Sequence, residues 1–267
     1  REGKNQTLSF PFAITTNTQG QFIVADDENV KVFDPLGKFL YSLPFEVPRY
    51  KYKTFNLATD RNDHIYHCFA WRNERPEILV FNRNHELHHR FPLRAAVSEA
   101  HSLTISNDDQ VFVVVYGNGE VEVDVYENGQ FAYSFGKDVM SQSLGMIYTI
   151  TTSGDGVMIL NSSAKCQIVY VFRANGDYLY NFKVNGFLRG CSSIVFFEPS
   201  QHVLIPSLNE DNENRGQLSI YTKNGELVRS VQLDTDKLPE LRGITITVDG
   251  LAAVTNYREN KVHVLQL

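Results

Sequence analysis

The sequence has few cysteines, one tryptophan and no long apolar run, and each shortage excludes a class of protein. Its three cysteines, Cys68, Cys166 and Cys191, are widely spaced and form no Cys-x-x-Cys pair. This spacing excludes a zinc ribbon and a disulfide framework. No stretch approaches the roughly 18 apolar residues of a membrane helix, and the first residues lead into no apolar signal segment. We therefore predict reduced thiols in a cytoplasmic protein with no membrane partner.

An excess of positive charge is also missing. The chain has 25 Lys and Arg against 31 Asp and Glu, a formal net charge of −6. A uniformly basic nucleic-acid-binding surface is therefore excluded, whereas a local basic patch is compatible with this charge. The 267 residues are 42% hydrophobic, which is typical of a globular protein with a buried core. We predict a single domain over residues 1–267.

What the sequence does contain is a repeat. A β-branched and aromatic pair followed by a polar turn occurs five times, as in Val32-Phe33 and Val171-Phe172. The five turns end at residues 37, 85, 129, 176 and 225, so the steps are 48, 44, 47 and 49 residues. Three of these turns contain Asn-Gly, which supplies the positive φ that a tight hairpin needs. Each unit therefore contains a β-hairpin.

Each repeat contains two further strands before its hairpin. The first is short, as at 13–15, and the second is a nearly continuous apolar run, which suits a strand buried on both faces. In five of the six units we place this second strand at 22–25, 111–115, 157–160, 203–205 and 251–254. Four-stranded units of ~40–50 residues indicate a β-propeller. We predict an all-β, six-bladed antiparallel propeller in which residues 5–9 complete the sixth blade and so close the ring.

The first unit carries a family resemblance. Gly20–Asp26, Asn29–Asp34 and Gly37–Phe39 resemble the strands and the turn of an NHL repeat, and a degenerate form of this pattern extends over the whole chain. Six NHL repeats in one ring are similar to the C-terminal domain of TRIM-NHL proteins. The resemblance implies that one face of the ring binds single-stranded or hairpin RNA and represses messages. The alternative that it implies is a protein-interaction platform or the substrate-recognition domain of a RING ubiquitin ligase.

The segments on the RNA-binding face of such a ring carry suitable chemistry. The segment 49–55 interleaves three basic residues with aromatic residues and contains no acid. Cations neutralise phosphates, and aromatic rings stack on unpaired bases. Loops and strand starts on the same face add further basic and aromatic residues. The predicted RNA-binding residues are Arg49, Tyr50, Lys51, Tyr52, Lys53, Phe55, Trp71, Arg72, His101, Tyr116, Lys165, Arg189, Arg242, Tyr257 and Arg258.

Two observations limit this interpretation. In the alternating segment 49–53, one set of alternate residues can be the buried side of a strand end, with the lysines on a solvated face. The loop at 209–215 is acidic and would repel phosphate. We therefore expect RNA across blades six, one, two and three, with blade five avoided. In the alternative, the acidic loop belongs to a protein-binding surface.

The sequence offers little support for an enzyme. Some six-bladed propellers are hydrolases or lyases with metal ligands in the central channel. The channel-side candidates here are Asp26, Asp60 and Asn256, which we interpret as strand caps or turn residues. The cluster His85, His88 and His89 falls on an outer strand, where alternate side chains point to opposite sides. We predict no catalytic residues, no bound metal, no cofactor and no small-molecule substrate.

Overall fold

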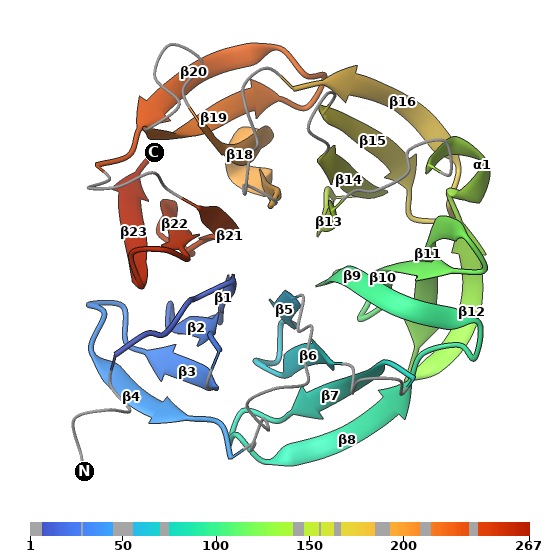
Figure 1. Ribbon diagram of the computed structural model, residues 1–267, viewed down its shortest axis with the longest axis horizontal. Helices are drawn as coiled ribbons and strands as arrows, with labels where there is room; N and C mark the ends of the chain where they lie inside the picture. Colours follow the sequence, from blue (N-terminus) through green and yellow to red (C-terminus); the bar gives the residue numbers. More distant parts are fainter. Residues whose placement is uncertain are drawn as a thin grey trace.

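The computed structural model describes residues 7–27, 29–44, 56–69, 75–140, 147–154, 156–162, 167–184, 193–208, 215–234 and 240–267. Six antiparallel sheets are arranged as blades around a central axis, with the chain running once around the ring (Figure 1). The predicted six-bladed β-propeller is thereby confirmed. Within each blade the strands pair in chain order from an inner first strand outward, with four strands in blades one to five and three described strands in blade six.

The first three blades each contain four strands. Blade one comprises β1 (Ala13–Thr16), β2 (Phe22–Ala25), β3 (Val30–Phe33) and β4 (Phe39–Ser42). Blade two comprises β5 (Asn56–Thr59), β6 (Ile65–Phe69), β7 (Glu77–Phe81) and β8 (Leu87–Pro92). Blade three comprises β9 (Val97–Ile105), β10 (Val111–Gly117), β11 (Glu120–Glu127) and β12 (Gln130–Phe135).

The last three blades follow the same order. Blade four comprises β13 (Ile147–Thr152), β14 (Gly156–Ser162), β15 (Gln167–Arg173) and β16 (Tyr178–Lys183). Blade five comprises β17 (Val195–Phe197), β18 (His202–Leu208), β19 (Gly216–Thr222) and β20 (Leu227–Gln232). Blade six comprises β21 (Leu241–Ile246), β22 (Leu251–Asn256) and β23 (Lys261–Gln266). Two one-turn helices are added, α1 (Lys137–Met140) before blade four and η1 (Glu198–Ser200) inside blade five.

The core lies between blades, because each sheet buries both faces of its second strand. This strand carries buried Val or Ile in five blades, whereas blade two has the buried His67 in the middle of β6. On the third strand, two blades place a buried charge opposite a valine: Lys31 lies opposite Val24, and Asp124 lies opposite Val113. Lys31 pairs with Asp26 at 2.6 Å, and Asp124 pairs with Arg94 at 2.7 Å. These pairs occupy the spaces between blades that apolar side chains fill elsewhere.

Hydroxyl groups join the inner strands of neighbouring blades around the axis. Thr15 lies 3.2 Å from Thr59, between blades one and two. Thr16 donates to the carbonyl of Ile246 at 3.1 Å, between blades one and six. The backbone amide of Ile150 donates to Ser102 in the same way, between blades three and four. Side-chain hydroxyls of the first strands therefore connect neighbouring blades at these three junctions.

The first and sixth blades meet, but not through the predicted outer strand at 5–9. Residues 5 and 6 lie outside the described residues, and the described remainder, Thr7–Ser9, is not in a strand. The Ser9 amide donates to the Asp26 side chain at 3.0 Å, and the Ser9 carbonyl accepts from the Asp27 amide at 2.9 Å. The backbone groups of Ser9 are therefore bonded to residues at the end of β2 in blade one. Among the described residues, the ring instead closes where β1 lies beside β21 (Figure 1).

The two faces of the ring have different connections. Turns between first and second strands and between third and fourth strands lie on one face, which we name the turn face. Connections between second and third strands and between successive blades lie on the opposite face, which we name the loop face. Among the described residues, no helix is long and apolar enough to cross a membrane.

Candidate functional site

The predicted RNA-binding residues are expected on the loop face, and most of them lie outside the described residues. Ten lie outside the described residues, namely Arg49, Tyr50, Lys51, Tyr52, Lys53, Phe55, Trp71, Arg72, Lys165 and Arg189. Five are described, namely His101, Tyr116, Arg242, Tyr257 and Arg258. The RNA site as a whole therefore stays a prediction, and the structure gives the geometry of these five positions.

Three of the five come together on blade six. Arg242 begins the inner strand β21, and Tyr257 and Arg258 form the connection between β22 and β23. The guanidinium of Arg242 lies over the ring of Tyr257, 5.5 Å from its centroid. Both arginines donate to Glu240, from Nε of Arg258 at 3.1 Å and from Nη2 of Arg242. The backbone amide of Tyr257 also donates to the Glu240 carbonyl at 2.9 Å, which fixes this connection to the start of β21.

Glu240 controls the electrostatics of this group. Burial raises the pKa of its carboxyl, but the hydrogen bonds from Arg242 and Arg258 outweigh burial and hold the pKa below its ordinary value. Glu240 is therefore ionised at neutral pH and neutralises part of the charge of both arginines. Sequence analysis singled out the two cations and missed this acid, because Glu240 precedes them by 2 and 18 positions and no local motif links the three.

A further residue that sequence analysis missed is Phe10. Its ring is 42% exposed and lies 5.0 Å from the ring of Tyr257. Its backbone has φ +53°, an uncommon value for a bulky residue, and its amide donates to the Asn260 side chain at 2.7 Å. We name Phe10, Glu240, Arg242, Tyr257 and Arg258 the blade-six patch. Segments more than 200 residues apart build it, which local sequence patterns do not reveal.

The remaining two described positions contact the core instead. His101 lies at a β-bulge in β9, where the register with β10 shifts, and its ring lies 5.9 Å from Tyr148 of the next blade. Tyr116 is partly buried against the core between blades three and four. A bulge changes the direction of a side chain, so His101 is displaced from the regular alternation of its strand. Neither residue joins the blade-six patch through a contact in the described part of the chain.

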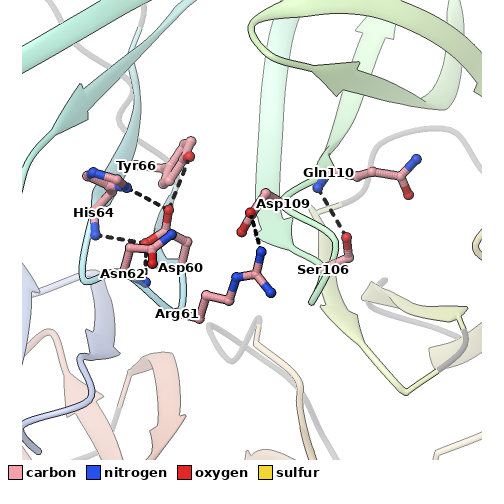
Figure 2. Close-up of polar contacts among 8 residues, drawn as sticks. All are labelled: Asp60, Arg61, Asn62, His64, Tyr66, Ser106, Asp109 and Gln110. Carbon is pink, nitrogen blue, oxygen red and sulfur yellow. Dashed lines mark hydrogen bonds and ion pairs between the residues drawn. The ribbon is translucent and has the colours of Figure 1, made fainter.

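The three channel-side polar residues have the structural roles predicted for them. Asp26 bonds to the amide of Asn29 as well as to Lys31, and Asn256 accepts from the amide of Glu240 at 3.4 Å. Asp60 accepts the amides of Asn62 and His64 at 2.9 and 2.8 Å, and it also contacts the His64 ring and the Tyr66 hydroxyl (Figure 2). These bonds close strand ends and turns.

The histidine cluster of blade two is larger than the sequence indicates. His64, from the turn before β6, stacks on His88 of β8 with ring centroids 5.7 Å apart, and His88 lies 5.2 Å from His89. The fourth, His85, lies against Tyr41 of blade one. The ranges that the structure describes contain no group of three or more His, Cys, Asp or Glu placed to hold a metal ion.

The class that the fold defines is a six-bladed β-propeller. No protein-family model matches the sequence, and no curated protein matches it either. Many solved structures share the fold. The resemblance to NHL repeats and to TRIM-NHL proteins stays a prediction, because these comparisons give the fold and no family.

Three structural neighbours illustrate the range of proteins with this fold. A catalytically inactive virginiamycin B lyase from Staphylococcus aureus, crystallised with quinupristin, is 14% identical, with a TM-score of 0.66 over 98% of this chain and 83% of that one. A gluconolactonase from Xanthomonas campestris is 10% identical, with a TM-score of 0.67 over 94% and 84%. A chain of a mitotic checkpoint complex is 8% identical, with a TM-score of 0.63 over 98% and 90%. At these identities the likeness shows the fold alone.

Proposed function

We propose that this propeller is a non-enzymatic protein-interaction platform and that the blade-six patch is part of its binding surface. The observation that carries the proposal is the shared carboxylate of Glu240, which both arginines of the patch contact. Cations that are already paired with an acid offer little net charge to a phosphate backbone. Arginine and aromatic residues are instead enriched among the residues that contribute most of the binding energy in protein–protein interfaces.

The charge around the patch supports the same choice. Glu240 offsets part of the charge of Arg242 and Arg258, and the charge of Asp27 acts on Tyr257. Nucleic-acid binding draws its main affinity from an excess of positive charge, which Glu240 reduces here. A protein partner that inserts an apolar or aromatic side chain beside Phe10 and Tyr257 needs no such excess.

Phe10 gives the patch a preformed apolar anchor. Its ring lies against Tyr257, and the bond from its backbone amide to Asn260 fixes the backbone that carries the ring. An aromatic side chain that is ordered before binding loses little conformational entropy when a partner covers it. Phe10→Ser should therefore weaken a partner that uses the patch by about 2 kcal/mol, or roughly 30-fold.

The test compares a patch variant with a matched control on the opposite face. Phe10→Ser/Arg258→Glu alters the patch, and Leu36→Ser alters a residue that is 94% exposed in a blade-one turn on the turn face. Proteins retained by the purified propeller are compared by quantitative mass spectrometry at 0.1 and 0.5 M salt, levels chosen to span strong and weak screening (Debye lengths of about 10 and 4 Å). We expect a partner that the patch variant loses, that the control keeps and that high salt does not release. Equal retention by both variants would contradict the proposal.

RNA binding is the second candidate, and the sequence of segment 49–55 favours it. Three cations interleaved with aromatic residues, without an acid, suit single-stranded RNA, and this segment belongs to blade two rather than to the blade-six patch. The test is selection from random short RNAs by the parent and by a Lys51/Lys53/Arg72 triple alanine variant. A motif that only the parent enriches, with a log–log salt slope of about −0.7 per phosphate contact, would support RNA readout. This outcome would favour a TRIM-NHL-like role in RNA binding over protein binding by the blade-six patch.

A further inference from the structure

A polar groove lies on the turn face of blade two, opposite the proposed protein-binding surface. Its volume is about 560 Å³, and all the residues that line it are polar. They come from a blade-one turn, from the two turns of blade two and from the start of β8. A lining without apolar side chains suits a ligand that is itself polar over most of its surface.

Two arginines and two histidines line the groove although the whole chain is acidic, namely Arg61, Arg83, His64 and His88. Its one lining acid, Asp63, uses its carboxylate oxygens on the amide and hydroxyl of Thr18, both at 2.8 Å.

Acids at the border of the groove are also engaged. Asp109, from the neighbouring turn of blade three, contacts Arg61 at 3.0 Å (Figure 2). Glu86 accepts from the Asn82 side chain at 3.2 Å. Arg83 is exposed and takes part in no ion pair among the residues that the structure describes. Arg83 therefore offers the groove a guanidinium that no described acid engages.

Asp60 orients one of the histidines. Its side chain is buried, and its Oδ2 lies 2.7 Å from Nδ1 of His64. Its Oδ1 accepts the two backbone amides of the same turn, so the carboxylate is fully used and the ring is fixed. With Nδ1 held by Asp60, Nε2 is the nitrogen of His64 that remains for a ligand, and Figure 2 shows this arrangement.

The histidines act on each other electrostatically. The rings of His64 and His88 are nearly parallel, with 9° between their planes. Burial, and then the charges of His88 and His64, lower the pKa of the neighbouring His89.

We propose that this groove binds a phosphorylated sugar or a similar small organic phosphate. The phosphate group would contact His64, His88 and Arg83, because arginine and histidine donate charge-assisted hydrogen bonds to oxyanions. The hydroxyl groups of the remainder would pair with the amide side chains of Asn62, Asn82 and Asn84, which line the same groove. The proposal is independent of the blade-six patch, since the two lie on opposite faces.

The experiment is calorimetric titration of the purified chain at pH 6.5 with glucose 6-phosphate, inorganic phosphate and glucose as separate probes. The groove variant is Arg83→Gln/His88→Gln, which changes two exposed side chains. The matched control is Arg173→Gln, an exposed arginine at the corresponding turn of blade four. We expect glucose 6-phosphate to bind more tightly than phosphate, glucose to give no heat, and the groove variant alone to lose at least tenfold in affinity.

Three results would overturn the proposal. Absence of binding by both phosphate-bearing probes would exclude an oxyanion site. Equal loss in the groove variant and the Arg173→Gln control would show that binding follows general surface charge. Equal affinity for phosphate and glucose 6-phosphate would exclude the sugar-phosphate class. Circular dichroism of the variant checks that it folds, and the single variants Arg83→Gln and His88→Gln replace it if it does not.

Discussion

The turn face and the loop face are held by hydrogen bonds of different sequence range. On the turn face, the first residue of a turn accepts the amide four positions later, as Asn17 does from Gln21, Asp60 from His64 and Asp34 from Lys38. On the loop face, Asp26 accepts from Ser9, 17 positions away, and Asn260 accepts from Phe10, 250 positions away. The turn face is therefore built locally, whereas the loop face is built from segments that meet only when the ring closes.

This difference separates local stability from ring stability. A defect in one turn leaves the strands of neighbouring blades paired, because its backbone bonds begin and end in the same turn. Side chains of adjacent turns also meet, at Thr18–Asp63 and at Arg61–Asp109. A defect at a loop-face junction releases the contact between blades one and six. Two buried carboxylates, Asp26 on the loop face and Asp60 on the turn face, allow a direct comparison.

The largest effect is expected at Asp26. Asp26→Ala removes the carboxylate that lies 2.6 Å from the buried ammonium of Lys31 and that also accepts the Ser9 amide. Breaking a buried ion pair by removing one partner costs about 3–5 kcal/mol. Urea unfolding followed by circular dichroism should show a loss of this size.

Two control variants separate the effect of the Asp26 charge on stability from the effect of its bond to the Ser9 amide. Asp26→Asn keeps an acceptor oxygen for only one of the amides of Ser9 and Asn29 and removes the charge, so its loss should be smaller than that of Asp26→Ala. In Asp26→Ala/Lys31→Met, no buried ammonium remains, and part of the stability should return. A loss below about 1 kcal/mol in Asp26→Ala would show that Lys31 is compensated by other groups.

A smaller effect is expected at Asp60. Asp60→Ala leaves the amides of Asn62 and His64 without their acceptor, which costs about 1–3 kcal/mol for partly buried groups. No buried cation is stranded, because the His64 side chain is partly exposed. Urea unfolding gives the size of the loss, and hydrogen exchange should show faster exchange at these two amides only. Faster exchange across blades one and three would contradict the local character of the turn face.

The local nature of the turn face also explains what the sequence predicts well. The Asn128-Gly129 hairpin has both residues at positive φ, and in the longer turns at 173–177 and 222–226 glycine alone takes this conformation. These signals, with the apolar alternation, are enough to predict six blades. They fail for the second strand of blade two, where His67 interrupts the apolar run although it is buried.

The candidate site is predicted only in part, because its contacts join residues that are far apart in the sequence. Arg242, Tyr257 and Arg258 were selected as separate cations and rings, and they do meet on blade six. Their function depends on Glu240 and Phe10, whose contacts with them form by tertiary packing and follow no spacing rule. The Thr7–Ser9 segment fails as a strand for a similar reason, since Asp26 and Asp27 bind its backbone.

The Glu240 junction should give a pH-dependent effect of about 1 kcal/mol. The pKa of its carboxyl is lowered in the folded chain, so its contribution is present above its ordinary value, near 4.3, and is lost as pH falls below that value. The wild type should therefore be more stable than Glu240→Gln at pH 7, and the two should converge near pH 3. Thermal unfolding across this range checks the sign, and a constant difference would show that the carboxylate charge is not responsible.

The smallest effect on stability is expected from the exposed arginines of the two faces. Arg258 is 55% exposed in its pair with Glu240, and Arg61 is 67% exposed in its pair with Asp109. Exposed ion pairs contribute little, so Arg258→Ala and Arg61→Ala should each cost less than about 0.5 kcal/mol.

The effects of these two variants on binding should differ, because Arg258 belongs to the blade-six patch and Arg61 lines the turn-face groove. Loss of the protein partner in Arg258→Ala alone, and of glucose 6-phosphate affinity in Arg61→Ala alone, would show that the faces act as separate sites. Loss of both ligands in either variant would show instead that the faces are coupled through the ring.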